Sequence, residues 1–133
     1  MAIFEWDDSI ALNIPVIDEQ HKGLIDMINM LHDALQKNET DRVIDEIFQK
    51  LILYVLEHFS EEERLMLSCR FPHYASHRQE HDQFVNRLKT IQIEFLDGEA
   101  LGQETLDFLV DWLICHIKGT DQMYRRFIQG EPA

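Results

Sequence analysis

Apolar residues recur every three or four positions along four long segments of the chain, which is the spacing of amphipathic helices. The pattern predicts helices over residues 18–38, 41–67, 72–97 and 103–119, with a last helical turn that reaches about residue 128. Asp18 is the expected N-cap of the first helix, and Thr40 is that of the second. Short connections between such helices favour an all-α fold, an antiparallel four-helix bundle with an up-down-up-down path.

Residues 1–17 precede the first predicted helix and are rich in apolar side chains, among them Phe4, Trp6 and Ile10. Pro15 is expected to prevent a helix through this segment, because proline blocks a helix interior. We therefore expect an ordered N-terminal arm that packs on the bundle. The length of 133 residues and the hydrophobic content of 45% fit a single domain over residues 1–133.

The net charge of the chain argues against two classes of partner, nucleic acids and anionic membranes. Twelve basic against 25 acidic residues give a net charge of −13, which nucleic acid and anionic membranes would repel. The N-terminus does not look like a signal peptide, and no stretch approaches the roughly 18 apolar residues of a membrane helix. Cys69 and Cys115 form no C-x-x-C pair, so free thiols are expected rather than a disulfide. These features predict a cytoplasmic protein.

Histidines occupy positions in the apolar stripes, where polar residues are unusual. His58 and Glu62 are four residues apart, so both side chains lie on one face of a helix. His77 and His81 repeat this spacing on the next predicted helix, and the stripes of the first and last helices contain His21 and His116. In an antiparallel bundle, these positions lie at the same end. Because burying such groups without partners is costly, the pattern predicts a metal site in one layer of the bundle.

Spacing leaves some candidates open. Asp121 follows His116 by five residues, which on a regular helix places it about 140° away. Gly119 lies between them and would allow a local distortion that turns Asp121 inward, so spacing does not decide its position.

Other neighbours of the predicted ligands compete with them. His73 precedes His77 by four residues and is expected in an exposed first turn. His32 shares the face of His21 but lies about 16 Å further along the helix, which is too far for one site. Glu61 is three residues from His58, so spacing alone does not separate it from Glu62.

Four motifs occur in order along the chain: His21, HFSEE from His58 to Glu62, HRQEH from His77 to His81, and HIKGTD from His116 to Asp121. This ordered set resembles the hemerythrin family, in particular the short single-domain bacteriohemerythrins, and the resemblance covers nearly the whole chain. The segments WDDSI, IDEQH and FPH resemble that family as well.

The resemblance implies a non-haem di-iron centre, with two iron ions, a bridging oxo or hydroxo group, and dioxygen as the ligand. Carried over to this sequence, one iron would be held by His77, His81 and His116. The other would be held by His21 and His58, which leaves one position open, and both would be bridged by Glu62 and Asp121.

The function that the resemblance implies is reversible dioxygen binding for oxygen storage, transport or delivery, without enzymatic activity. Positions matching the apolar oxygen pocket of the family are Leu24, Phe59, Trp112, Leu113 and Ile117. A monomer is expected, with dioxygen and an oxygen-consuming enzyme as partners. Two alternatives use the same site: a sensor of oxygen, nitric oxide or redox state that acts through a partner, and a weak di-iron peroxidase or oxidase.

Overall fold

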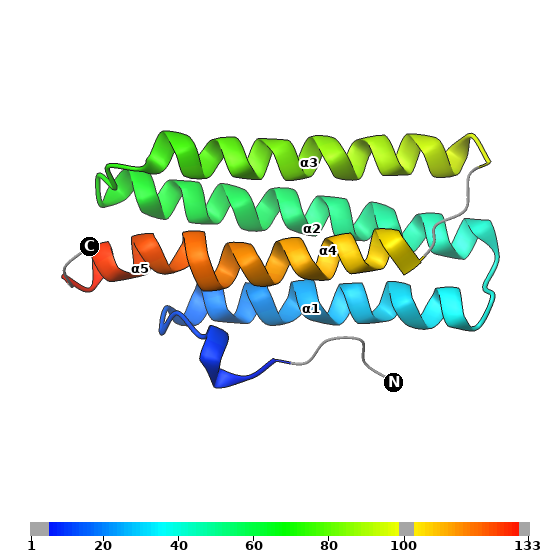
Figure 1. Cartoon of the computed structure of the whole chain (residues 1–133), viewed down its shortest axis with the longest axis horizontal. Helices are drawn as coiled ribbons and strands as arrows, with labels where there is room; N and C mark the ends of the chain where they lie inside the picture. Colours follow the sequence, from blue (N-terminus) through cyan, green and yellow to red (C-terminus); the bar gives the residue numbers. More distant parts are fainter. Residues whose placement is uncertain (1–5, 99–102, 131–133) are drawn as a thin grey trace.

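The computed structural model describes residues 6–98 and 103–130 of the chain. Within these residues the elements are all helical: α1 (Pro15–Gln36), α2 (Asp41–Ser68), α3 (Tyr74–Leu96), α4 (Gln103–Cys115), a π-helix (His116–Asp121) and α5 (Gln122–Ile128), after a short 3-10 turn (Asp8–Ile10). In Figure 1, α4 continues through the π-helix into α5, so that four rods lie side by side. The prediction of an all-α four-helix bundle is confirmed.

The start of α1 differs from the prediction. The helix begins at Pro15, because proline is tolerated in a first turn, and its N-cap is Ile14 rather than Asp18. The Asp18 carboxylate instead accepts hydrogen bonds from the backbone N–H groups of Leu12 (2.8 Å) and Asn13 (3.1 Å). Asp18 therefore ties the arm to the first turn of α1 rather than capping that helix.

The arm packs on the bundle, as its apolar composition predicts. Ile10 and Leu12 are fully buried, and Trp6 packs against the main core. The Gln129 amide donates a hydrogen bond to the Leu12 carbonyl (3.2 Å), which joins the arm to the end of α5. Phe4 lies outside the described residues.

The other helix ends lie within two residues of their predicted positions, except that α4 ends at Cys115 instead of residue 119, because the π-helix begins at His116. Thr40 caps α2, since its hydroxyl oxygen accepts a hydrogen bond from the backbone N–H of Val43 (3.3 Å). α3 begins at Tyr74, two residues after the predicted start, because Pro72 lies in the preceding turn. No described helix is long and apolar enough to cross a membrane.

The apolar core consists of two clusters with a polar layer between them. The larger cluster includes Leu24, Phe59 and Ile117, and the smaller one consists of Leu12, Ile17, Met66, Phe71 and Tyr124. Along α1, α2 and the last rod, a buried polar residue falls between members of the two clusters: His21, Glu62 and Asp121 respectively. The fold thus encloses these polar groups in apolar side chains on both sides.

Candidate metal centre

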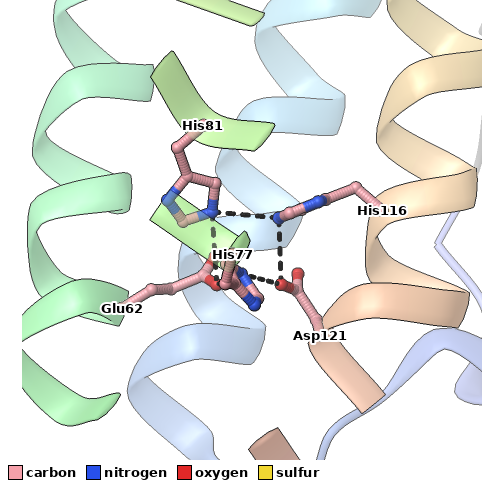
Figure 2. Close-up of side chains that lie close together, drawn as sticks. All are labelled: Glu62, His77, His81, His116 and Asp121. Carbon is pink, nitrogen blue, oxygen red and sulfur yellow. Dashed lines mark hydrogen bonds and ion pairs between the residues drawn. The ribbon is translucent and has the colours of Figure 1, made fainter. Parts of the chain in front are cut away.

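Seven polar side chains from the four rods meet in the buried layer. Each is at most 3% exposed: His21, His58, Glu62, His77, His81, His116 and Asp121. Figure 2 shows five of them, with Glu62, the α3 histidines, His116 and Asp121 turned toward one another. All seven side chains that the sequence singled out therefore lie in one place.

Glu62 divides its two carboxylate oxygens between two groups of histidines. Its Oε1 atom lies 3.3 Å from His21 Nε2 and is in contact with His58 Nε2. Its Oε2 atom lies 3.5 Å from His77 Nε2 and 3.9 Å from His81 Nε2. One carboxylate thus faces α1 and α2 with one oxygen and α3 with the other.

Asp121 divides its oxygens in the same way. Its Oδ1 atom lies 2.9 Å from His77 Nε2 and 3.0 Å from His116 Nε2, whereas Oδ2 lies 3.3 Å from His21 Nε2. The layer therefore contains two histidine groups with two carboxylates between them. This is the arrangement in which two carboxylates can bridge two cations.

The π-helix explains how Asp121 reaches the layer. Its hydrogen bonds run from residue i to i+5, so the backbone winds more slowly than in an α-helix. His116 and Asp121 are the first and last residues of this six-residue segment. The wider turn brings both side chains to the same face, which a regular helix would prevent. The local helix distortion that Gly119 would allow is therefore present, and it turns Asp121 inward.

The donor atoms of the layer fit metal ions better than they fit one another. Ligand atoms within 4.8 Å of one another form two groups, one of Glu62, His77, His81, His116 and Asp121, the other of His21, His58 and Glu62. Several buried atoms in these groups have no hydrogen-bond partner among the described residues, including Glu62 Oε2, His77 Nε2 and both Asp121 oxygens. Bound cations would satisfy these lone pairs, so the residues fit a two-metal centre.

The histidines and carboxylates of the layer strongly shift one another's pKa values. Burial disfavours the charged form of His21, but the carboxylates of Asp121 and Glu62 beside its Nε2 atom outweigh that effect and raise the pKa of His21 to about 9. At His116 the charge of Asp121 also outweighs burial and raises the pKa to about 10. At His81 burial prevails and lowers the pKa to about 3. Burial would raise the pKa of Glu62 and of Asp121, but the surrounding histidines hold both below their ordinary values. Without metal, protons shared by these groups offset the carboxylate charge.

An apolar cavity of about 10 Å³ lies next to the layer, close to the size of one water-sized sphere. Four of the five predicted pocket residues line it: Leu24, Phe59, Trp112 and Leu113. Ile117 is buried in the core but is not among the lining residues. The remaining lining residues were not predicted, because their sequence shows only that they belong to the apolar stripes: Ile28, Leu51, Val55, Phe84 and Leu109.

The competing candidates lie outside the two groups. His73 is exposed and precedes α3, where its carbonyl accepts a hydrogen bond from the His77 backbone N–H (3.1 Å). His32 is half-buried on α1, and Glu61 pairs with Arg64 on the surface of α2 (2.8 Å). Cys69 and Cys115 are free thiols.

Comparison with known proteins assigns the family. Residues 12–128 match the model of the hemerythrin HHE cation binding domain. A bacteriohemerythrin of Stenotrophomonas maltophilia is 36% identical over 93% of this chain and 80% of its own length. A myohemerythrin of Theromyzon tessulatum is 31% identical over 92% of this chain and 91% of its own.

A crystal structure of wild-type hemerythrin superimposes with a TM-score of 0.87 at 35% identity, covering 92% of this chain and 95% of the other. Sequence, fold and the buried layer of histidines and carboxylates agree, and the chain therefore belongs to the hemerythrins, a family of di-iron, oxygen-binding proteins.

Proposed function

We propose that this chain binds dioxygen reversibly at a non-haem di-iron centre, for oxygen storage, transport or delivery. The observation that carries the proposal is the division of the two carboxylates. Glu62 and Asp121 each direct one oxygen toward His77 and the other toward His21. Such carboxylates can bridge two cations, whereas a single-metal site has no need of them.

The distances support one assignment of ligands to the two ions. His77, His81 and His116 would hold one iron, since their Nε2 atoms lie around the same Asp121 or Glu62 oxygens. His21 and His58 would hold the other, beside Glu62 Oε1. The second ion would have one protein ligand fewer, which leaves a coordination position for dioxygen.

The two ferrous ions, when bound, supply the electrons that hold dioxygen and recover them when it leaves. The surrounding residues would keep this exchange reversible by excluding water. The described residues that line the cavity beside the layer are apolar, Phe59 and Trp112 among them. None of these described residues is an acid that could protonate a bound oxygen, so we propose binding without catalysis.

We propose that the protein acts in the cytoplasm as a monomer and supplies an oxygen-consuming enzyme. Gel filtration tests the monomer, since elution at the size of a 15.8 kDa chain is expected.

The decisive experiment is optical. The purified chain, reconstituted with ferrous iron under anaerobic conditions, should contain two irons and remain nearly colourless. Exposure to oxygen should produce an absorption band that disappears when oxygen is removed and returns on re-exposure. An irreversible change, or a chain that retains no iron, would refute the proposal.

A further inference from the structure

We infer that Gln20 and Glu63 are positioning residues that make the two halves of the proposed centre electronically unequal. Each accepts a hydrogen bond from the outward ring nitrogen of one histidine, but one acceptor is neutral and the other is anionic. The inference rests on the proposed metal centre and extends it to residues that do not touch the metal.

The His81 ring is held from two sides. Its Nδ1–H donates to Glu63 Oε2 (3.1 Å), so the lone pair is on Nε2, which faces His116 Nε2 at 3.0 Å. Figure 2 shows this ring with one nitrogen toward His116 and the other turned away. The Phe59 ring stacks on the His81 ring at 3.7 Å between centroids, with an interplanar angle of 2°. Hydrogen bond and stacking together fix the tautomer and the orientation.

Glu63 itself is placed to act as a carboxylate. It is 20% exposed at the edge of a groove between α2 and α3, and Arg78 Nε lies 3.7 Å from its Oε1 atom. A carboxylate that accepts the outer N–H of a metal-bound histidine makes the ring a stronger donor to the metal.

The His58 ring has a different partner. Its Nδ1–H donates to the side-chain oxygen of Gln20 (2.7 Å), at a small hollow that Tyr54 and Glu57 also line. An amide oxygen accepts the hydrogen bond and so fixes the same tautomer, with Nε2 toward Glu62. Because the amide is neutral, it adds less electron density to the ring than a carboxylate does.

The outward nitrogens of the other three histidines also differ in their surroundings. Glu80 Oε1 lies 3.8 Å from Nδ1 of His116, within ion-pair distance. Nδ1 of His21, of His77 and of His116 has no hydrogen-bond partner among the described residues, so Glu80 acts on His116 through its charge and not through a hydrogen bond. Among the described residues, the carboxylates within 4 Å of an outward ring nitrogen are Glu63 and Glu80, and both face the His77, His81 and His116 half, whereas Glu57 lines the hollow beside His58 without such a contact. That half should hold the ferric state more firmly, while the half with the open position keeps weaker donors.

Reciprocal substitutions of equal shape separate this role from packing. Glu63→Gln removes the charge but keeps an acceptor, and Gln20→Glu adds a charge. We expect the reduction potential of the iron-loaded protein to rise in Glu63→Gln and to fall in Gln20→Glu. Each change should be about tenfold in the balance between ferric and ferrous forms, which is roughly 59 mV for one electron.

Matched controls account for the change in net charge. Glu61→Gln removes the same charge from the same helix, where Glu61 pairs with Arg64. Gln83→Glu adds one at an exposed position of α3. Shifts of the same sign in the two test variants, or shifts no larger than those of the controls, would overturn the inference.

Zinc affinity gives a second readout without iron chemistry. The metal-free protein is titrated with Zn²⁺ against a chelating dye. Glu63→Leu should weaken zinc binding by about 10- to 100-fold because the acceptor is lost, whereas Glu63→Gln should retain most of the affinity. Zinc affinity in Glu63→Leu equal to that of the wild type would overturn the inference.

The oxygen experiment separates the two proposals. Opposite shifts in a protein that fails to bind oxygen reversibly would refute the proposed function alone. Reversible binding without those shifts would refute this inference alone. A chain that retains neither iron nor zinc would refute both.

Discussion

Phe59 separates the histidine layer from the apolar cavity, and its truncation tests both stability and water exclusion. The side chain is 4% exposed, stacks on His81 and lies 5.8 Å from the Trp112 ring centroid. Phe59→Ala would join the space of the ring to the existing cavity of about 10 Å³ and remove the support of His81.

The magnitude follows from burial. Truncation of a buried phenylalanine to alanine costs about 3–5 kcal/mol. For a domain of this size, about 4 °C per kcal/mol predicts a fall in Tm of roughly 10–20 °C for the metal-free protein. If the ring also excludes water, spontaneous oxidation of the oxygenated protein should accelerate on the order of tenfold, which corresponds to about 1.4 kcal/mol in the barrier.

Phe48→Ala is the matched control. Phe48 is 1% exposed in the same helix and core, and it precedes Phe59 by eleven residues, or about 16 Å. Thermal unfolding should show a similar loss in both variants, whereas only Phe59→Ala should oxidise faster when the decay of the oxygenated band is followed. Equal oxidation rates in the two variants would refute the role of Phe59 as a barrier to water.

Three further outcomes are expected. His58→Ala removes one of only two histidines from its ion, so iron analysis should give fewer than two irons per chain; an unaltered ratio with intact oxygen binding would contradict the ligand assignment. Trp112→Ala removes a ring stacked on His116 at 4.4 Å and should keep iron but speed autoxidation, and an unchanged decay of the oxygenated band would argue against shielding. In the metal-free protein, the pKa values of about 9 for His21 and about 10 for His116 exceed the ordinary 6.5. The protonated histidines therefore stabilise the fold fully below pH 6.5, and this stabilisation is lost as the pH rises toward 10. Tm measured from pH 7 to 10 should fall, and a constant Tm would exclude this contribution.

The convergence of the histidines could be predicted because it depends on helical periodicity and on the antiparallel packing of the helices. His58 and Glu62, like His77 and His81, are four residues apart and share a face on any regular helix. Antiparallel packing then places the end of one helix beside the start of the next. No knowledge of individual contacts was needed for this part of the site.

The start of α1 was predicted wrongly for a local reason. Asp18 has the side chain of a good N-cap, but its carboxylate binds the backbone of the arm instead. Pro15 breaks a helix only when it lies in the interior, and here it lies in the first turn. Composition cannot distinguish these alternatives, because each depends on where the arm packs.

The contacts behind the histidines had no sequence signal. Gln20 and Glu63 lie beside predicted ligands in the sequence, as many polar surface residues do. Their hydrogen bonds depend on the rotation of α1 against α2 and of α2 against α3, and these rotations are set by core packing. A pattern of apolar positions determines which face of a helix is buried, but not the contacts that polar side chains make at the edge of that face.

Asp121 lies at the limit of what spacing can predict, because the π-helix places it one residue later than a regular helix would. Deleting the exposed Lys118 would reduce the separation of His116 and Asp121 from five residues to four, the spacing of His58 and Glu62.

A regular α-helix would then bring both side chains to one face, about 40° apart, and would leave Tyr124 of α5 in its present packing. We expect the Lys118 deletion to retain two zinc ions per chain and a Tm close to that of the wild type. Deleting the exposed Gln79, between His77 and His81, should instead rotate one part of α3 by about 100° against the other and abolish metal binding. If both deletions lost zinc equally, the π-helix would contribute more than the register of Asp121, and the explanation by register alone would be wrong.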